Sequence, residues 1–170
     1  MALKRIFLTA LLLSLFLNTS VEAKTEIFSG KVVGVSDGDT ISVLVNGIVR
    51  KVRLNGIDCP EKKQAFGQQA KSFTSASSFD KEVKVLGSGT DRYKRTIGEV
   101  ILPNGENLNE LLLQNGFAWW YKKYSSDEHK HQLEDQARKQ KRGLWQDQHA
   151  SAPWDFRKAK TASRAIQVRF

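Results

Sequence analysis

Charged and turn-forming residues are concentrated in the segment RLNGIDCPE, which runs from Arg53 to Glu61. In a regular strand Arg53 and Asp58, five residues apart, would point to opposite faces of the sheet. Gly56 lies between them and can allow a bulge that changes the direction of the chain. The segment is therefore either an ordinary charged strand end or a place where a cation and a phosphate meet. Taken alone, it supports both interpretations equally.

A second acidic segment, SDGDT, comes earlier in the chain and places Asp37 and Asp39 on either side of a glycine. Carboxylates at this spacing can supply ligands to a hard cation such as Ca²⁺, which takes six to eight oxygen ligands. The later ligand positions of an EF-hand loop are absent. By itself this segment favours a simple turn.

A third segment, DRYKR, combines three basic residues and a tyrosine between Asp91 and Arg95. An arginine offers a planar fork of donors to a phosphate, and a tyrosine offers a hydroxyl group. A solvated basic loop is the common alternative.

The elements that must position these segments can be predicted from periodicity and turn signals. Alternating apolar residues predict strands between Glu26 and Ile57, interrupted by the hairpin signal Asn46-Gly47. Two more strands are predicted over residues 82–86 and 96–102. Helices are predicted over Gln64–Ser78, Asn107–Asn115 and Ser125–Arg142.

Asn107 and Ser125 are each followed three residues later by a glutamate, which fits a capping box at the start of a helix. The predicted order is three strands, a helix, two strands and two helices. We therefore expect an α+β fold, mostly β: a five-stranded OB-fold barrel with three helices.

The composition narrows the choice of partners. The chain has 27 Lys and Arg against 18 Asp and Glu, a formal net charge of +9. This excess favours a polyanion, nucleic acid before an anionic membrane, although charge that only maintains solubility is the alternative. The single cysteine, Cys59, excludes an internal disulfide, and we interpret it as a small side chain in a turn rather than a reactive thiol.

The N-terminal segment has the layout of a secretory signal peptide, residues 1–23. Two basic residues precede an apolar run, Ile6–Leu17, which is shorter than the roughly 20 residues of a spanning helix. We expect a secreted or periplasmic protein without stable membrane association after signal cleavage. The OB-fold domain would cover 24–148, followed by a basic and partly disordered tail over 149–170.

The three segments, in this order and at these intervals, resemble the motifs of the staphylococcal nuclease (thermonuclease) family, in its bacterial secreted branch. The resemblance covers about Glu26 to Trp145, where GFAWWYKKY and ARKQKRGLW also resemble the broader bacterial branch. It implies an OB-fold and Ca²⁺-dependent hydrolysis of DNA and RNA. The products that it implies carry 3′-phosphate and 5′-hydroxyl ends.

The resemblance also implies a metal site. By it, Asp39 and Asp58 are the carboxylate ligands of Ca²⁺, Asp37 is an acidic neighbour, and Cys59 supplies a backbone carbonyl. The family has a threonine where this chain has Cys59. A backbone ligand tolerates that exchange, although a hydroxyl contact would be lost.

The remaining roles implied by the resemblance are catalytic and substrate-binding. Arg53 and Arg95 match the phosphate-binding arginines, and Glu61 matches the glutamate that activates or orients the attacking water. Tyr93 and Tyr124 match tyrosines that contact the substrate.

One departure from the family bears on the third segment. Lys94 stands where the family has a glycine, and a lysine would be strained there if the position needs a positive φ. The placement of Arg95 depends on this loop.

The rival to a monomeric endonuclease of low sequence specificity is a non-catalytic OB-fold module that only binds nucleic acid. A pure binder does not need two aspartates, a glutamate and two arginines together. Trp119, Trp120 and Tyr121 form a further aromatic run, for which base stacking and core packing are equally favoured.

Overall fold

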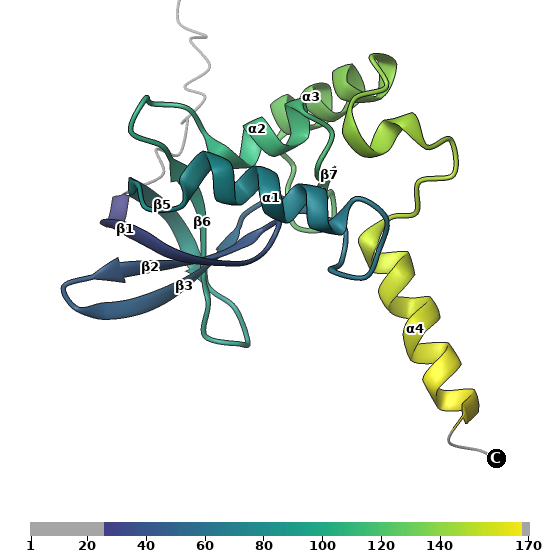
Figure 1. Ribbon diagram of the computed structural model, residues 1–170, viewed down its shortest axis with the longest axis horizontal. Coiled ribbons are helices and arrows are strands. Elements are labelled where there is room, and N and C mark those ends of the chain that lie inside the picture. The colour runs from purple at the N-terminus through teal and green to yellow at the C-terminus, as the bar shows by residue number, and fades with distance from the viewer. Residues whose placement is uncertain (1–25, 168–170) are drawn as a thin grey trace, which may run out of the picture.

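The computed structural model describes residues 26–167, and its centre is a closed five-stranded barrel (Figure 1). The strands are paired in the order β1-β2-β3-β6-β5. Their bounds are Glu26–Asp37 for β1, Thr40–Val45 for β2, Ile48–Leu54 for β3, Glu82–Thr90 for β5 and Thr96–Ile101 for β6. The predicted barrel and its α+β, mostly β class are confirmed.

Local turn chemistry and one parallel pairing close the barrel. Asn46 and Gly47 have φ values of 49° and 79°, as a two-residue hairpin requires, and join β2 to β3. Strand β3 then pairs in parallel with β6, where Leu54 lies opposite Gly98. The buried residues of the interior are mainly β-branched and include Val32, Ile41, Val43, Val52, Val83, Val85 and Val100.

Four α-helices and a short 3-10 helix surround the barrel in the part of the chain that the structure describes. They are α1 (Gly67–Ser78), α2 (Leu108–Gln114), α3 (Glu128–Lys139), η1 (Gly143–Gln146) and α4 (Pro153–Gln167). A two-residue strand β4, Ile57–Asp58, pairs with β7, Trp119–Trp120. This small sheet joins the segment after β3 to the segment after α2.

The helix starts depend on caps, and two differ from the sequence prediction. Asn107 caps α2 as predicted, since its side chain accepts a hydrogen bond from the Asn109 N–H. Helix α3 begins later than Ser125, because Asp127 accepts from two backbone N–H groups of its first turn. Helix α1 begins at Gly67 rather than Gln64, after Phe66 in a left-handed conformation.

Helix α4 is the largest departure from the sequence prediction. The predicted fold has three helices, and within residues 26–167 the structure has a further α-helix over Pro153–Gln167, in the segment predicted as a basic tail. In Figure 1 its far end points away from the barrel, while its first turn contacts the rest of the chain. There Trp154 stacks on Tyr121, with ring centroids 5.2 Å apart and planes at 8°.

The predicted signal peptide lies outside the described residues. Within residues 26–167, no helix has the length and apolar character needed to cross a membrane. The domain boundaries and the export of the chain stay predictions.

Candidate active site

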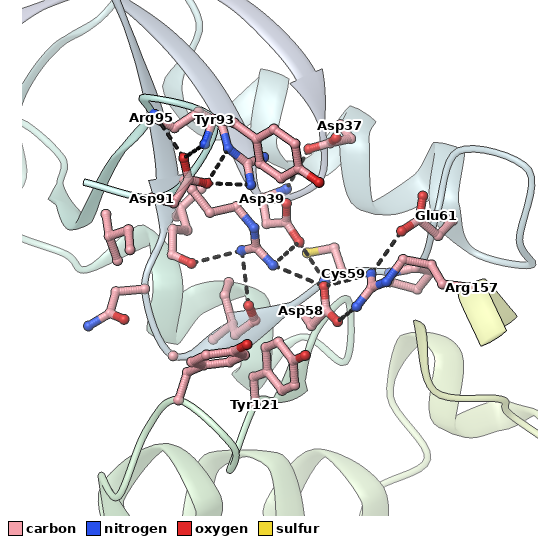
Figure 2. A pocket seen from close by; sticks show the side chains of 18 of the residues that line it. Asp37, Asp39, Asp58, Cys59, Glu61, Asp91, Tyr93, Arg95, Tyr121 and Arg157 are labelled. Carbon is pink, nitrogen blue, oxygen red and sulfur yellow. Dashed lines mark hydrogen bonds and ion pairs between the residues drawn. The ribbon is translucent and has the colours of Figure 1, made fainter. Parts of the chain in front are cut away.

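One pocket of about 770 Å³ gathers the three segments singled out in the sequence (Figure 2). Every predicted site residue lines it: Asp39, Arg53, Asp58, Cys59, Glu61, Tyr93, Arg95 and Tyr124. The other polar and aromatic residues of the lining include Asp37, Asp91, Arg92, Tyr121 and Arg157, of which Arg157 has no role in the sequence prediction. The fold therefore brings the predicted residues together, and their individual roles remain to be tested.

The turn after β3 explains how Arg53 and Asp58 meet. Gly56, with φ 73°, turns the chain between β3 and β4, so the two side chains do not remain on opposite faces. Arg53 Nη2 lies 2.9 Å from Asp58 Oδ1 and 3.2 Å from Asp39 Oδ2. Its Nη1 donates to the carbonyls of the same turn, and the guanidinium is largely buried.

The turn between β1 and β2 is pressed against the same segment. A Cβ on Gly38 would lie 2.7 Å from the Cβ of Cys59, so only glycine allows this approach. The Gly38 carbonyl accepts a hydrogen bond of 2.6 Å from Thr74 Oγ1, which α1 holds in the interior. The Cys59 N–H donates to Asp39 Oδ2 at 2.7 Å. Helix α1 and these contacts fix Asp39 beside Asp58.

Burial raises the pKa of two carboxyl groups of this cluster, Asp37 and Asp58. Burial and then the neighbouring Asp39 raise the pKa of Asp37 to about 6. Burial also raises the pKa of Asp58, although the guanidinium of Arg157 counteracts this effect. A cation at this point would relieve the repulsion between the carboxylates.

The cysteine in the cluster is not a nucleophile. Burial is the main cause that raises the pKa of the Cys59 thiol well above its usual value, with the Asp39 carboxylate adding to it. A buried thiol of this kind stays protonated and unreactive. The geometry supports the interpretation of Cys59 as a small side chain packed in a turn.

The donor set fits a hard cation. Within residues 26–167, no group of three or more His, Cys, Asp or Glu side chains forms a metal cluster. Asp39 and Asp58 nevertheless converge, because both contact the same nitrogen of Arg53. With the Cys59 carbonyl that the family resemblance implies, these carboxylates would offer only oxygen ligands, which suit Ca²⁺ rather than Zn²⁺ with its usual nitrogen and sulfur ligands.

The third segment places a second arginine at the pocket. Arg95 Nε and Nη2 lie 2.8 and 2.7 Å from Asp91 Oδ2, and Nη1 donates to Thr40 Oγ1 at 3.3 Å. Lys94 has φ 61°, so the position does require the left-handed conformation that a glycine adopts more easily. The departure from the family pattern strains the backbone, but Asp91 still holds Arg95 at the pocket wall.

The aromatic side chains near the pocket fall into two groups, those exposed at the pocket and those packed in the interior. Tyr93 and Tyr124 are 64% and 65% exposed, which leaves their rings available to a ligand. Tyr121 also lines the pocket and meets Tyr124 edge to face at 4.9 Å. Trp119 and Trp120 instead pack against buried residues of the interior. The aromatic run therefore divides between packing and the pocket.

Glu61 and Arg157 form a contact that the sequence analysis missed. Arg157 reaches from α4 into the pocket, where its Nη1 lies 2.8 Å from Glu61 Oε1 (Figure 2). Its Nη2 lies 2.7 Å from Asp58 Oδ2. The available signal was the run PWDFRK, in which Trp154 and Arg157 lie three residues apart and share a face if the run is helical.

Glu61 itself is positioned by the loop before α1. Its backbone N–H donates to Gln64 Oε1 at 3.1 Å, and its carbonyl accepts from the Gln64 N–H at 2.8 Å. A Cβ on Gly67 would lie 2.1 Å from the Glu61 carbonyl oxygen, so the glycine at the start of α1 permits this close packing.

Comparisons with known proteins agree with this geometry. The family model described as "Staphylococcal nuclease homologue" matches residues 51–147. A protein of Shigella flexneri named "Micrococcal nuclease" is 42% identical over 142 residues, 78% of this chain and 82% of that protein.

Two further relatives carry the name "Uncharacterized endonuclease". The one from Escherichia coli O157:H7 is 40% identical over 77% of this chain and 86% of its own length. The one from Haemophilus influenzae is 36% identical over 96% of this chain and 90% of its own length. With the barrel and the pocket described above, these matches show that the chain belongs to the staphylococcal nuclease family and is a nuclease.

Proposed function

We propose that the protein is a Ca²⁺-dependent endonuclease that hydrolyses DNA and RNA with low sequence specificity and leaves 3′-phosphate and 5′-hydroxyl ends. The observation that carries the proposal is the convergence of two buried carboxylates and two guanidinium groups on one pocket. Asp39 and Asp58 supply the first pair, and Arg53 and Arg95 the second. Exposed tyrosines at the rim offer surfaces on which bases can stack.

The two arginines would act on charge that develops during the reaction. Attack of water on the phosphorus forms a new P–O bond and increases the negative charge on the phosphoryl oxygens. Arg53 and Arg95 are held by acidic partners, so they need little reorganisation to stabilise that charge. Ca²⁺ bound by Asp39, Asp58 and the Cys59 carbonyl would add Lewis-acid stabilisation of the same oxygens.

Glu61 is the group that would accept the proton of the attacking water. Its carboxylate lies at the pocket and is 40% exposed, so water can reach it. As the bond from phosphorus to the 5′ oxygen breaks, the phosphate stays on the 3′ side and the other fragment leaves with a 5′-hydroxyl.

Export of the protein is part of the proposal. The predicted signal peptide supports a mature chain that begins at Lys24 and works outside the cytoplasm, where we propose that it acts as a monomer. N-terminal sequencing of the active protein from cells checks this point, and a sequence that begins at Met1 would contradict it.

The direct test is incubation of the mature protein with supercoiled plasmid and with RNA, in Ca²⁺ and in excess chelator. We expect nicking and degradation only with Ca²⁺, and DNA ends that a polymerase extends only after phosphatase treatment. Glu61→Gln should abolish most of the cleavage, whereas Glu106→Gln, at an exposed position outside the pocket lining, should not. Undiminished cleavage in excess chelator would show that the metal has no part in the reaction. DNA that is shifted in a gel but not cut would favour the non-catalytic binding protein.

A further inference from the structure

Helix α4 places a positive charge on the two carboxylates that the proposed reaction needs most. The Arg157 guanidinium bridges Asp58, a proposed metal ligand, and Glu61, the proposed base (Figure 2). We propose that docked α4 is an autoinhibitory element, in which Arg157 acts as an internal counter-cation that Ca²⁺ must displace before the site becomes active. The inference rests on the proposed function and specifies the regulation of the same site.

The contacts of Asp58 indicate that Ca²⁺ and Arg157 compete for its carboxylate. Its side chain is 2% exposed, and both of its oxygens already have cationic partners. Oδ1 accepts from Arg53 at 2.9 Å and from Arg157 at 3.3 Å, and Oδ2 accepts from Arg157 at 2.7 Å. A metal ion that binds Asp58 must take over the oxygen that Arg157 holds. Arg53 contacts only Oδ1, so Ca²⁺ and Arg157 would compete for Oδ2 of the same buried carboxylate.

The same contact would suppress catalysis directly. The Glu61 Oε1 atom accepts a hydrogen bond from Arg157 Nη1 at 2.8 Å, so this oxygen is not available to accept the proton of an attacking water. Displacement of Arg157 would therefore free the metal ligand and the base in one step.

The attachment of α4 is small enough to be reversible. Ala152 and Pro153 are buried and Phe156 is half-buried, Trp154 stacks on Tyr121 and meets Trp119 edge to face, and Arg157 forms the ion pairs. From 158 to 163 the side chains are exposed. Release of the helix would thus break one short patch of contacts rather than a domain core.

The docked helix also covers a pocket residue. Trp154 lies parallel to the ring of Tyr121, which lines the pocket, and occupies one face of it. When α4 is released, that face becomes available to a base of the substrate. Because coupling is reciprocal, Ca²⁺ should loosen α4 by the same factor by which docked α4 weakens Ca²⁺ binding.

The test is calorimetric titration of the mature chain with Ca²⁺ in the absence of nucleic acid. Arg157→Gln should bind Ca²⁺ roughly 10- to 100-fold more tightly than the wild type, the usual range for such coupling. Lys158→Gln is the matched control, since it removes the same charge from the next residue, which pairs only with Asp155 among the described contacts. Its affinity for Ca²⁺ should equal that of the wild type within about twofold.

Hydrogen exchange gives a second readout on the helix itself. In the wild type, saturating Ca²⁺ should accelerate exchange over 153–163 and leave the amides of α1 unchanged. Arg157→Gln should show the accelerated exchange without Ca²⁺.

The outcomes separate the two proposals. Equal Ca²⁺ affinities in the wild type and in Arg157→Gln would overturn the autoinhibitory role and leave the nuclease proposal intact. Weaker Ca²⁺ binding in Arg157→Gln would also overturn it and make Arg157 a supporting residue of the metal site. Absence of Ca²⁺ binding in both proteins would overturn the calcium dependence itself.

Discussion

Two ion-pair clusters in this protein contain the same charges but differ in how far they are exposed to solvent. In each, one cation bridges two carboxylates: Lys130 between Glu99 and Asp127, and Arg157 between Asp58 and Glu61. The Lys130 side chain is 2% exposed, whereas the Arg157 side chain is 42% exposed. The first cluster joins α3 to the barrel, and the second opens onto a pocket.

The difference shows which ion pair can be exchanged. Burial alone would lower the pKa of Lys130, but its partners Asp127 and Glu99 raise it by more. The pKa of Lys130 is therefore raised, and the lysine keeps its charge. Removal of that charge would leave a carboxylate buried without its cation. At Arg157 a metal ion or a substrate can reach the carboxylates through the pocket. The first cluster is therefore structural, and the second is suited to a change of partner.

The largest expected effect comes from breaking the buried cluster. Lys130→Met should lower the free energy of unfolding by about 3 to 5 kcal/mol, because it removes one member of a buried ion pair, the ammonium that lies 2.6 Å from Glu99. Arg157→Gln should change it by less than about 1 kcal/mol, since that pair is partly exposed. Urea unfolding of both variants measures the contrast. Equal losses of stability would show that α4 is part of the structural core.

Arg53 sharpens the comparison because it shares Asp58 with Arg157 but is mostly buried. Arg53→Ala should lower kcat by about two orders of magnitude, on the scale of losing one preorganised donor, and change KM much less. Arg53→Lys should restore little activity, because an ammonium cannot reproduce the two-pronged contact. The measurement is steady-state cleavage of a short labelled strand. A change confined to KM would make Arg53 a binding residue only.

A smaller effect on stability is expected in the loop between Asp91 and Arg95, where an ion pair spans a strained backbone. Lys94→Gly should relieve the left-handed conformation and raise the free energy of unfolding by up to about 1 kcal/mol, with Asp91 still holding Arg95. Thermal unfolding measures the gain. A loss of stability larger than that value would mean that Lys94 makes contacts that outweigh its strain.

The smallest effect is expected from the exposed part of α4. Lys158→Gln combined with Lys160→Gln removes two charges that lie beyond Arg157 and are exposed. We expect unchanged kcat, a modest rise of KM and a salt dependence reduced by about two phosphate contacts. Cleavage assays at two salt concentrations detect this. A fall in kcat would show that these lysines contribute to the chemical step and not only to binding.

Sequence reasoning predicted what short-range rules determine. The Asn46-Gly47 turn, the cap at Asn107 and the alternating strands follow from neighbours in the chain. The capping-box pattern predicts Ser125 as the cap, whereas the structure uses Asp127 two residues later, because a sequence pattern does not fix the exact end of a helix. The strands β4 and β7 are too short to leave a periodic signal, and their pairing depends on tertiary contacts.

The gathering of the three segments was predicted through their resemblance to a family, and Arg157 shows where that reasoning ends. The contact joins Arg157 to Asp58, 99 positions apart, and the run PWDFRK can indicate only that Trp154 and Arg157 share a helix face, not which residues they contact. From its composition alone, a basic segment with few apolar residues at its start is expected to be a solvated tail. Only the structure shows that Tyr121 provides a stacking partner for Trp154.

The initial rate of cleavage as a function of Ca²⁺ concentration, for the wild type, Arg53→Ala and Arg157→Gln, tests most directly whether Asp58 serves a metal-dependent site that α4 restrains. We expect Arg53→Ala to remain slow at every Ca²⁺ concentration. We expect Arg157→Gln to reach half of its maximal rate at roughly 10- to 100-fold less Ca²⁺ than the wild type. Rates independent of Ca²⁺, or a parallel loss of activity in both variants, would contradict this assignment of the site.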